Sequence, residues 1–224
     1  MNNSPRNRAL LLVGMKMIER IDTPNGRFYR TPEGNVYPSV TTVLGSIPNT
    51  SLDAWKRSVG DVEAERVSKL AAARGTRLHA FCEDYLTGKN PVLDIFDRQA
   101  YTGLSTQLDM LEPIAIERFM YSDRLRVAGT PDCIAKYQGK LCVVDFKTTS
   151  RQKHDGEFDS YWLQTAAYSA MCYERLKLVV PNLLIIMQNL TSGECNVYQQ
   201  ACSIWLPRFK SIRDAYQDQR PFLS

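Results

Sequence analysis

Long apolar runs are absent from this sequence of 224 residues. A membrane-spanning helix needs roughly 18–20 consecutive apolar residues, and no segment approaches that length. The apolar stretch from Leu10 to Val13 is too short even for the hydrophobic region of a secretory signal. No internal repeat or low-complexity segment is present either. We therefore expect a protein without a membrane partner.

Paired cysteines are also absent. None of the six cysteines stands in a C-x-x-C arrangement, so we expect neither a zinc site nor an iron–sulfur cluster. Their scatter through apolar segments predicts buried free thiols in a reducing, intracellular compartment. The six are Cys82, Cys133, Cys142, Cys172, Cys195 and Cys202.

The chain lacks a strong excess of either charge. It has 28 basic and 24 acidic residues, a net charge of +4 and a pI near 8.7. This mild basicity is compatible with a nucleic-acid partner but does not establish one. With 44% hydrophobic and 23% charged residues, we expect one globular domain over residues 1–224, large enough for a real core.

The first seventeen residues contain Arg6, Arg8 and Lys16 and no acid. This composition predicts a short flexible leader over residues 1–17. A mitochondrial transit peptide shares the same bias and stays open as an alternative.

The stretch from Leu125 to Ser150 predicts two strands joined by a tight turn. The part from Leu125 to Tyr137 is mostly apolar and β-prone. Gln138-Gly139 is a turn dipeptide with glycine where a positive φ is needed. The following apolar run is typical of a strand buried on both faces.

This hairpin brings two carboxylates together. With Gln138 and Gly139 as the central turn residues, facing residues have numbers that add up to 277, so Asp132 faces Asp145. Directly opposed like charges destabilise a hairpin, and Lys147 on the same face balances only one of them. A divalent cation between the two acids resolves the conflict. A buried Asp145–Lys147 pair, with Asp132 capping the bend at Pro131, is an alternative that spacing leaves open.

The order Gly-Thr-Pro-Asp132, an apolar strand, then Asp145-Phe-Lys147 resembles the Pro-Asp…(Asp/Glu)-x-Lys signature of the PD-(D/E)XK nuclease superfamily. The segment YQGKLCVVDFKT is similar to RecB-like members, which include mitochondrial and phage exonucleases. The resemblance implies an α/β fold with a restriction-endonuclease-like core, a mixed β-sheet flanked by helices. It also implies that Asp132, Asp145 and Lys147 are catalytic and that the two aspartates bind Mg²⁺ or Mn²⁺.

Further metal ligands follow from the same resemblance. Gly75-Thr-Arg-Leu-His79 matches a Gly-x-x-x-His pattern in which the histidine completes the metal shell and the glycine lets helix and sheet approach closely. The backbone carbonyl of Phe146 is implied as another ligand, and Glu117 as a candidate one. From the residues alone, His79 can instead be a hydrogen-bonded core residue and Glu117 a paired glutamate on an edge strand.

Several residues are candidates for DNA binding. Gln164 and Tyr168 share one helix face and match a Gln-x-x-x-Tyr motif that contacts nucleic acid in the RecB family.

Two further groups are candidates from their chemistry. Thr148, Thr149 and Arg151 follow the second strand of the hairpin, where hydroxyls and a guanidinium can hold a phosphate. Trp55 with Lys56 combines a stacking surface with a positive charge, which suits single-stranded DNA; a core position for Trp55 is the alternative.

The rest of the chain predicts a small opening hairpin, five helices and three strands. Ser51 is a candidate helix cap, and Gly60 can divide the first helix. Hydroxyls in the stretch Tyr37 to Leu44 can contact phosphate or cap a helix. The expected elements are a hairpin turning at Pro24–Gly26, helices at Ser51–Leu70, Ala71–Leu86, Asp97–Leu111 and Tyr161–Leu176, strands at Glu112–Tyr121, Asn182–Leu190 and Cys195–Gln200, and a closing helix at Ile204–Gln219.

The sequence thus predicts a metal-dependent DNA exonuclease that hydrolyses phosphodiester bonds in DNA replication, recombination or repair. Its partner is DNA with free ends or single-stranded regions. A non-catalytic DNA-binding protein on the same fold and a structure-specific endonuclease stay open as alternatives. Size and leader suit a phage enzyme in the infected host cytoplasm, which we favour, or an organellar enzyme in the mitochondrial matrix.

Overall fold

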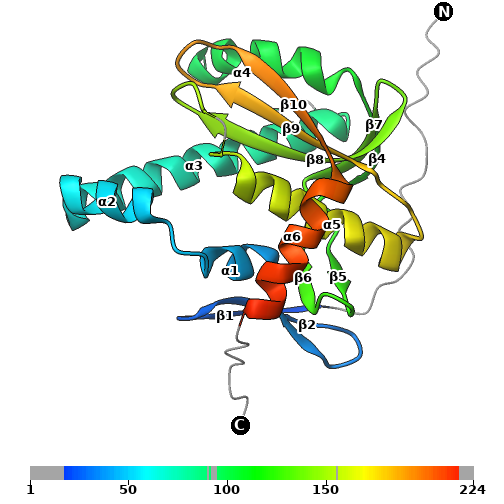
Figure 1. Cartoon of the computed structure of the whole chain (residues 1–224). Helices are drawn as coiled ribbons and strands as arrows, with labels where there is room; N and C mark the ends of the chain where they lie inside the picture. Colours follow the sequence, from blue (N-terminus) through cyan, green and yellow to red (C-terminus); the bar gives the residue numbers. More distant parts are fainter. Residues whose placement is uncertain (1–17, 90, 92–94, 155, 217–224) are drawn as a thin grey trace, which may run out of the picture.

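The computed structural model describes residues 18–89, 91, 95–154 and 156–216. The leader predicted for residues 1–17 lies outside the described residues. The architecture is a sheet of five strands with helices on both faces (Figure 1). This confirms the expected α/β class, and the sheet is mixed, because β8 and β9 run parallel while the other neighbours are antiparallel.

The strand order in the sheet is β10-β9-β8-β7-β4. The middle of the central strand β8, residues 142–146, is buried, as its continuous apolar run predicts, while both ends of the strand are more accessible. A crossover through one helix joins the parallel pair. The five strands are β4 (Leu111–Ile116), β7 (Cys133–Tyr137), β8 (Lys140–Thr149), β9 (Asn182–Asn189) and β10 (Cys195–Ala201).

Two cores form because residues alternate between the two faces of β8 and β9. On one face Val143 and Ile185 pack against α1 (Val40–Gly45), α5 (Asp159–Leu176) and α6 (Cys202–Ala215). On the other face Val144 and Phe146 pack against α3 (Asp61–Leu86) and α4 (Ile95–Leu108). The functional hairpin β7–β8 is therefore covered by helices on both sides.

Two smaller sheets stand beside the main one. The opening hairpin forms as expected, from β1 (Glu19–Thr23) and β2 (Gly26–Arg30), with β3 (Val36–Pro38) added. Ser39 then caps α1 by accepting a hydrogen bond from the Thr42 N–H, so the capping alternative holds for this stretch. The second sheet pairs β5 (Met120–Ser122) with β6 (Val127–Gly129).

The expectation of a single strand from Leu125 to Tyr137 is wrong. The stretch divides into β6 and β7, which belong to different sheets. Pro131 lies between them and has no N–H to donate to a ladder, so the chain bends there and changes sheets.

The strand expected from Glu112 to Tyr121 is also divided, into β4 and β5. Glu117 stands at the break with φ 44°, a left-handed conformation that few non-glycine residues adopt. An irregularity in the pairing between Pro113 and Ala115 changes which side chains face inward. Ile114, expected to be buried, is consequently 43% exposed.

The division of the first helix that Gly60 made possible is confirmed, whereas the separate boundary expected near residue 70 is wrong. This glycine (φ 81°) ends α2 (Thr50–Val59), and α3 then runs unbroken for 26 residues. Asn49, rather than Ser51, caps α2. None of the α2 residues is buried, and α2 with the first turns of α3 forms an arm that projects from the body (Figure 1). A core position for Trp55 is therefore wrong.

The six cysteines are free and, except for the half-buried Cys195, buried, as predicted. No helix in the described ranges is both long and apolar enough to cross a membrane.

Candidate active site

The hairpin that carries the two aspartates has the register that its turn predicts. Every paired residue of β7 and β8 obeys the sum of 277. Gln138 (φ 51°) and Gly139 (φ 76°) both have positive φ, as a two-residue turn of type I′ requires. Asp132 immediately precedes β7, so one further step of this register places it opposite Asp145.

Asp132 is almost fully buried, with 6% of its surface exposed. Its Oδ2 accepts a hydrogen bond of 2.7 Å from the Phe146 N–H, which ties the acid to β8. Burial raises the pKa of Asp132 above its ordinary value, and the positive charges of His79 and Lys147 offset this only in part.

Asp145 is 1% exposed and faces Lys147, whose Nζ lies 2.5 Å from Asp145 Oδ2. Neither carboxylate oxygen of Asp145 has a hydrogen-bond partner of acceptable geometry. Burial raises the pKa of Asp145 to about 6, against the opposing effect of Lys147. For Lys147, burial lowers the pKa, but the nearby charges of Asp145 and Asp132 outweigh it and raise the pKa. The amine is therefore charged at neutral pH.

His79 approaches the hairpin from α3. Its Nε2 lies 3.1 Å from the carbonyl oxygen of Phe146, and because a carbonyl only accepts, Nε2 carries the proton. Nδ1 then faces Asp132 Oδ1 at 3.4 Å and Glu117 Oε1 at 3.9 Å. Burial lowers the pKa of His79, but the nearby carboxylates of Glu117 and Asp132 outweigh it and raise the pKa. The Nδ1 lone pair thus faces two carboxyl groups, and a proton or a cation between them would relieve the repulsion.

Glu117 is brought to the site by its unusual backbone. Its N–H donates to the carbonyl oxygen of Asp132 at 3.0 Å, so the break between β4 and β5 is fastened to the bend before β7. One ligand atom each from His79, Glu117 and Asp132 lie within 4.8 Å of one another. The structure thus includes Glu117 in the cluster, while Asp145 stands beside it and contacts Lys147.

These residues fit a divalent cation. Asp145 Oδ1 is buried and has no hydrogen-bond partner among the described residues, and the only charged group in contact with Oδ2 there is the Lys147 amine. One amine does not balance this acid and the buried Asp132 together, so a cation beside Oδ1 would lower the cost of burying both. The contact between His79 Nε2 and a backbone carbonyl is the usual way in which a metal-binding histidine is oriented, with the other nitrogen free for the metal. The Phe146 carbonyl, predicted as a ligand, is in contact with His79 in this arrangement.

The predicted pair Gln164 and Tyr168 lies on α5. Gln164 is half-buried and its Nε2 donates to the Tyr168 hydroxyl at 3.4 Å. Tyr168 is only 4% exposed, and burial raises its pKa. A Cβ placed on Gly129 would lie 2.9 Å from Tyr168 Cε1, so the Gly-Thr-Pro-Asp segment packs directly on this ring. Tyr168 supports the bend before Asp132, and Gln164 is the more accessible of the two.

The end of β8 carries the other predicted group. Thr148 and Thr149 are half-buried, and Thr149 Oγ1 donates to the carbonyl oxygen of Arg151. The Arg151 guanidinium is exposed but paired with Glu157, with Nη1 2.9 Å from Oε2. To bind a phosphate, Arg151 must exchange this carboxylate for it.

Trp55 and Lys56 are not brought to the metal cluster. They lie on α2, in the arm, where Trp55 is half-buried and Lys56 is exposed (Figure 1).

Tyr161 was missed by sequence analysis. Its ring centroid lies 5.2 Å from Lys147 Nζ and 5.2 Å from Lys153 Nζ. The available signal was its place one helical turn before Gln164, on the same face of α5.

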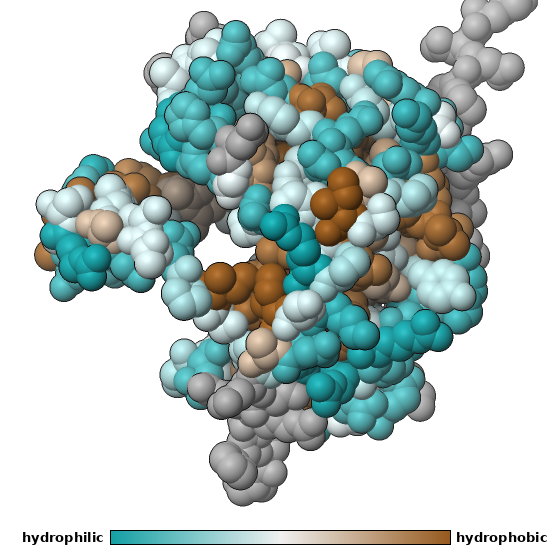
Figure 2. Space-filling view, viewed as in Figure 1, coloured by the Kyte–Doolittle hydropathy of each residue, from teal (hydrophilic) through white to brown (hydrophobic). Residues whose placement is uncertain are grey.

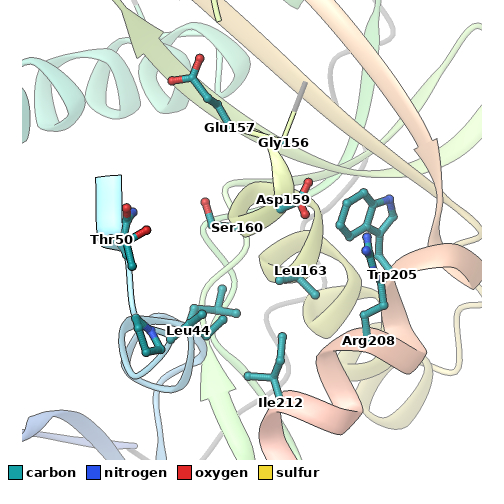
Figure 3. A pocket seen from close by; sticks show the side chains of 13 residues that line it. Leu44, Thr50, Gly156, Glu157, Asp159, Ser160, Leu163, Trp205, Arg208 and Ile212 are labelled. Atoms are coloured by element: carbon teal, nitrogen blue, oxygen red, sulfur yellow. The ribbon is translucent and has the colours of Figure 1, made fainter. Parts of the chain in front are cut away.

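A separate pocket of about 480 Å³ lies between α1, the connection to α2, and the helices α5 and α6. In Figure 3, Leu44, Leu163 and Ile212 gather around it from three elements. None of the predicted metal-binding or DNA-binding residues lines it. Glu157, which pairs with Arg151, is on its wall, so the pocket adjoins the end of β8.

The chain was compared with known protein families. The model of the family described as the PD-(D/E)XK nuclease superfamily matches residues 50–201. This range includes the arm, His79, the hairpin and α5.

Individual relatives have modest identity. The chain is 29% identical over 170 residues to mitochondrial genome maintenance exonuclease 1 of Homo sapiens, covering 67% of this chain and 49% of that protein. It is 29% identical over 149 residues to the protein of that name in Xenopus tropicalis, covering 58% of this chain and 42% of that protein. For the Mus musculus protein of that name the identity is 27% over 131 residues, covering 53% of this chain and 39% of that protein. The chain thus spans about half, or less, of each relative.

Proposed function

We propose that this chain, which belongs to the PD-(D/E)XK nuclease superfamily, is a DNA exonuclease that depends on Mg²⁺ or Mn²⁺ and hydrolyses phosphodiester bonds. The observation that carries the proposal is the buried Asp145 carboxylate. Its Oδ1 has no hydrogen-bond partner in the described part of the chain, its Oδ2 contacts Lys147, and it stands opposite a second buried acid. A purely structural ion pair has no need for the second acid.

Asp132, Asp145, His79 and Glu117 would hold the cation, which when bound supplies Lewis-acid polarisation of the phosphate. The charged amine of Lys147 offsets the negative charge that accumulates on the pentavalent phosphate. The amine of Lys147, which contacts Asp145, is proposed to position or deprotonate the attacking water. Gln164, Thr148, Thr149 and Arg151 are proposed to bind the DNA backbone, and Trp55 with Lys56 to bind it on the arm.

A requirement for free DNA ends is supported by the shape of the molecule. Figure 2 shows an opening between the arm and the body. The arm is closed at both ends, by the connection from α1 and by the continuous helix α3. A strand that passes through a closed opening must enter by its end. The relatives are named exonucleases, which agrees with this mode of entry.

The relatives are also named mitochondrial, and none of those reported above is a phage protein. This favours the mitochondrial matrix over the phage-infected host that the sequence suggested. A role in DNA replication, recombination or repair goes with the proposed activity.

The test is digestion of end-labelled linear DNA and of circular single-stranded DNA, each with Mg²⁺, Mn²⁺ or EDTA. We expect linear DNA to be degraded from its ends with either metal, and neither substrate to be cut in EDTA. Cutting of the circle would instead indicate an endonuclease. Binding without cleavage under every condition would indicate a non-catalytic DNA-binding protein.

A further inference from the structure

Two ammonium groups converge on the ring of Tyr161, in the first turn of α5. Lys147 Nζ and Lys153 Nζ each lie 5.2 Å from its centroid, within the range of cation–π attraction. The ring is held in turn by Phe158, which meets it edge-on at 88° with centroids 6.3 Å apart. Phe158 is buried, so the ring has a rigid support.

The ring matters most for Lys147 once the acids bind a cation. In the structure, Asp145 Oδ2 is the carboxylate oxygen that contacts the Lys147 amine. A cation bound by Asp145 competes for that oxygen and weakens the hold of the acid on the amine. Tyr161 is then the neighbour that keeps Lys147 beside the reacting phosphate.

Lys153 differs from the nearby Arg151. Arg151 is paired with Glu157, whereas Lys153 makes no direct ion pair with a carboxylate in the described ranges and acts on Glu157 only at longer range. Its amine can therefore bind a phosphate without first breaking an ion pair. Because both amines contact one ring, they cannot be further apart than twice the 5.2 Å that separates each from the centroid. Two cations so close suit phosphates of a single strand.

We propose that Tyr161 is a positioning residue that fixes Lys147 at the reacting phosphate, and that Lys153, held by the same ring, binds a second phosphate of the same strand. This inference rests on the proposed nuclease function for its kinetic part only, since phosphate binding by Lys153 requires no cleavage.

The first experiment compares Tyr161→Phe, which keeps the ring, with Tyr161→Leu, which removes it. We expect Tyr161→Phe to retain wild-type kcat and Tyr161→Leu to lose at least about tenfold in kcat with a smaller change in KM, as misplacement of a reacting group produces. Tyr173→Leu, at an exposed tyrosine of the same helix, is the matched control. Equal kcat for Phe and Leu variants would overturn the role of the ring. Should Tyr161→Leu not fold, Tyr161→Met replaces it in the comparison.

The second experiment measures binding of single-stranded DNA in EDTA against salt concentration. Lys153→Met should lower the salt slope by about one phosphate contact, and Tyr161→Leu should lower it similarly because Lys153 is released. Lys136→Met, at an exposed lysine of β7, should leave the slope unchanged. An unaltered slope in Lys153→Met would overturn the phosphate contact. If the wild type binds but never cleaves, the nuclease proposal fails while this measurement still decides the role of Lys153.

Discussion

Lys147 has two roles in the site: its amine balances the charge of the buried acids, and it is the proposed catalytic lysine. The side chain is largely buried, with 19% exposed, and its amine faces Asp145 on one side and an aromatic ring on the other. A buried lysine that keeps its charge needs such neighbours, because burial alone favours the neutral amine.

We predict that Lys147→Ala abolishes cleavage, with a loss of about 10² to 10⁴ in rate, typical for the removal of a charged or proton-transferring group. DNA and metal binding should be largely retained. Cleavage assays with Mg²⁺ and binding by fluorescence anisotropy check this, with Lys140→Ala, at the exposed start of the same strand, as control. Substantial cutting by Lys147→Ala would refute the assignment.

Asp145 makes metal binding dependent on pH. Burial raises its pKa from 3.8 to about 6. The metal-free fold therefore loses stability as pH rises from about 4 to about 6, because the folded protein holds this proton more tightly than the unfolded chain does. An acid stabilised by a salt bridge would have the opposite effect. A bound cation requires Asp145 to be ionised and His79 Nδ1 to be unprotonated. Both requirements make cation binding stronger as pH rises.

We therefore predict that Mg²⁺ raises the melting temperature little at about pH 5 and clearly more at about pH 7.5. Differential scanning fluorimetry with and without Mg²⁺ measures the shift. In Asp145→Asn the shift should be small at both values. An equal shift in the wild type at both pH values contradicts the ligand role of Asp145.

At the scale of elements, α3 presents His79 to the sheet without the close approach that its glycine suggested. A Cβ on Gly75 would have no neighbouring atom within 4 Å outside its own helix, so the family pattern does not explain this glycine here.

Gly75→Ala should stabilise the fold by about 0.5–1 kcal/mol, because alanine loses less backbone entropy in a helix. Gly129→Ala is the matched opposite, since its Cβ would stand 2.9 Å from Tyr168 Cε1. It should destabilise the fold by about 1–3 kcal/mol. Urea unfolding measures both, and a destabilising Gly75→Ala would be the contrary result.

The helix α2 adds surface without adding to the core. Trp55→Ala should lower the melting temperature only slightly, because Trp55 is half-buried and none of the α2 residues is fully buried. Affinity for single-stranded DNA should fall by about 1–3 kcal/mol if bases stack on the indole. Anisotropy titrations measure this, with Tyr173→Ala as the control at another exposed ring. Unchanged affinity would remove Trp55 from the DNA-binding surface.

Local signals predicted the functional hairpin well and its surroundings less well. The turn Gln138-Gly139 determines the register of β7 and β8, so the facing acids follow from sequence. The division at Pro131 was missed because an apolar run predicts a strand but not which sheet it joins. The contact between His79 and Phe146 joins residues 67 positions apart, which local patterns do not predict, and a family pattern was needed to bring them together.

At the scale of the whole molecule, the arm and the body together enclose the opening seen in Figure 2. The sequence predicted DNA with free ends from family resemblance, but the opening itself arises from the unpredicted length of α3, which begins at Asp61.

We predict that a linear single strand with streptavidin bound at both biotinylated ends resists digestion, because the bulky tetramer cannot pass the opening. The same biotinylated strand without streptavidin should be degraded. Gel assays of both substrates with Mg²⁺ decide this. Degradation of the blocked strand at an unreduced rate would mean that DNA reaches the site without passing under the arm.

The pairing of β7 with β8 also restricts how such a chain can change in length. One residue inserted into the paired part of either strand, without a compensating bulge, would move that strand's carboxylate to the opposite face of the sheet. Changes in length between these acids are therefore best tolerated at the turn, whereas the interval from His79 to Asp132 is not restricted by this pairing.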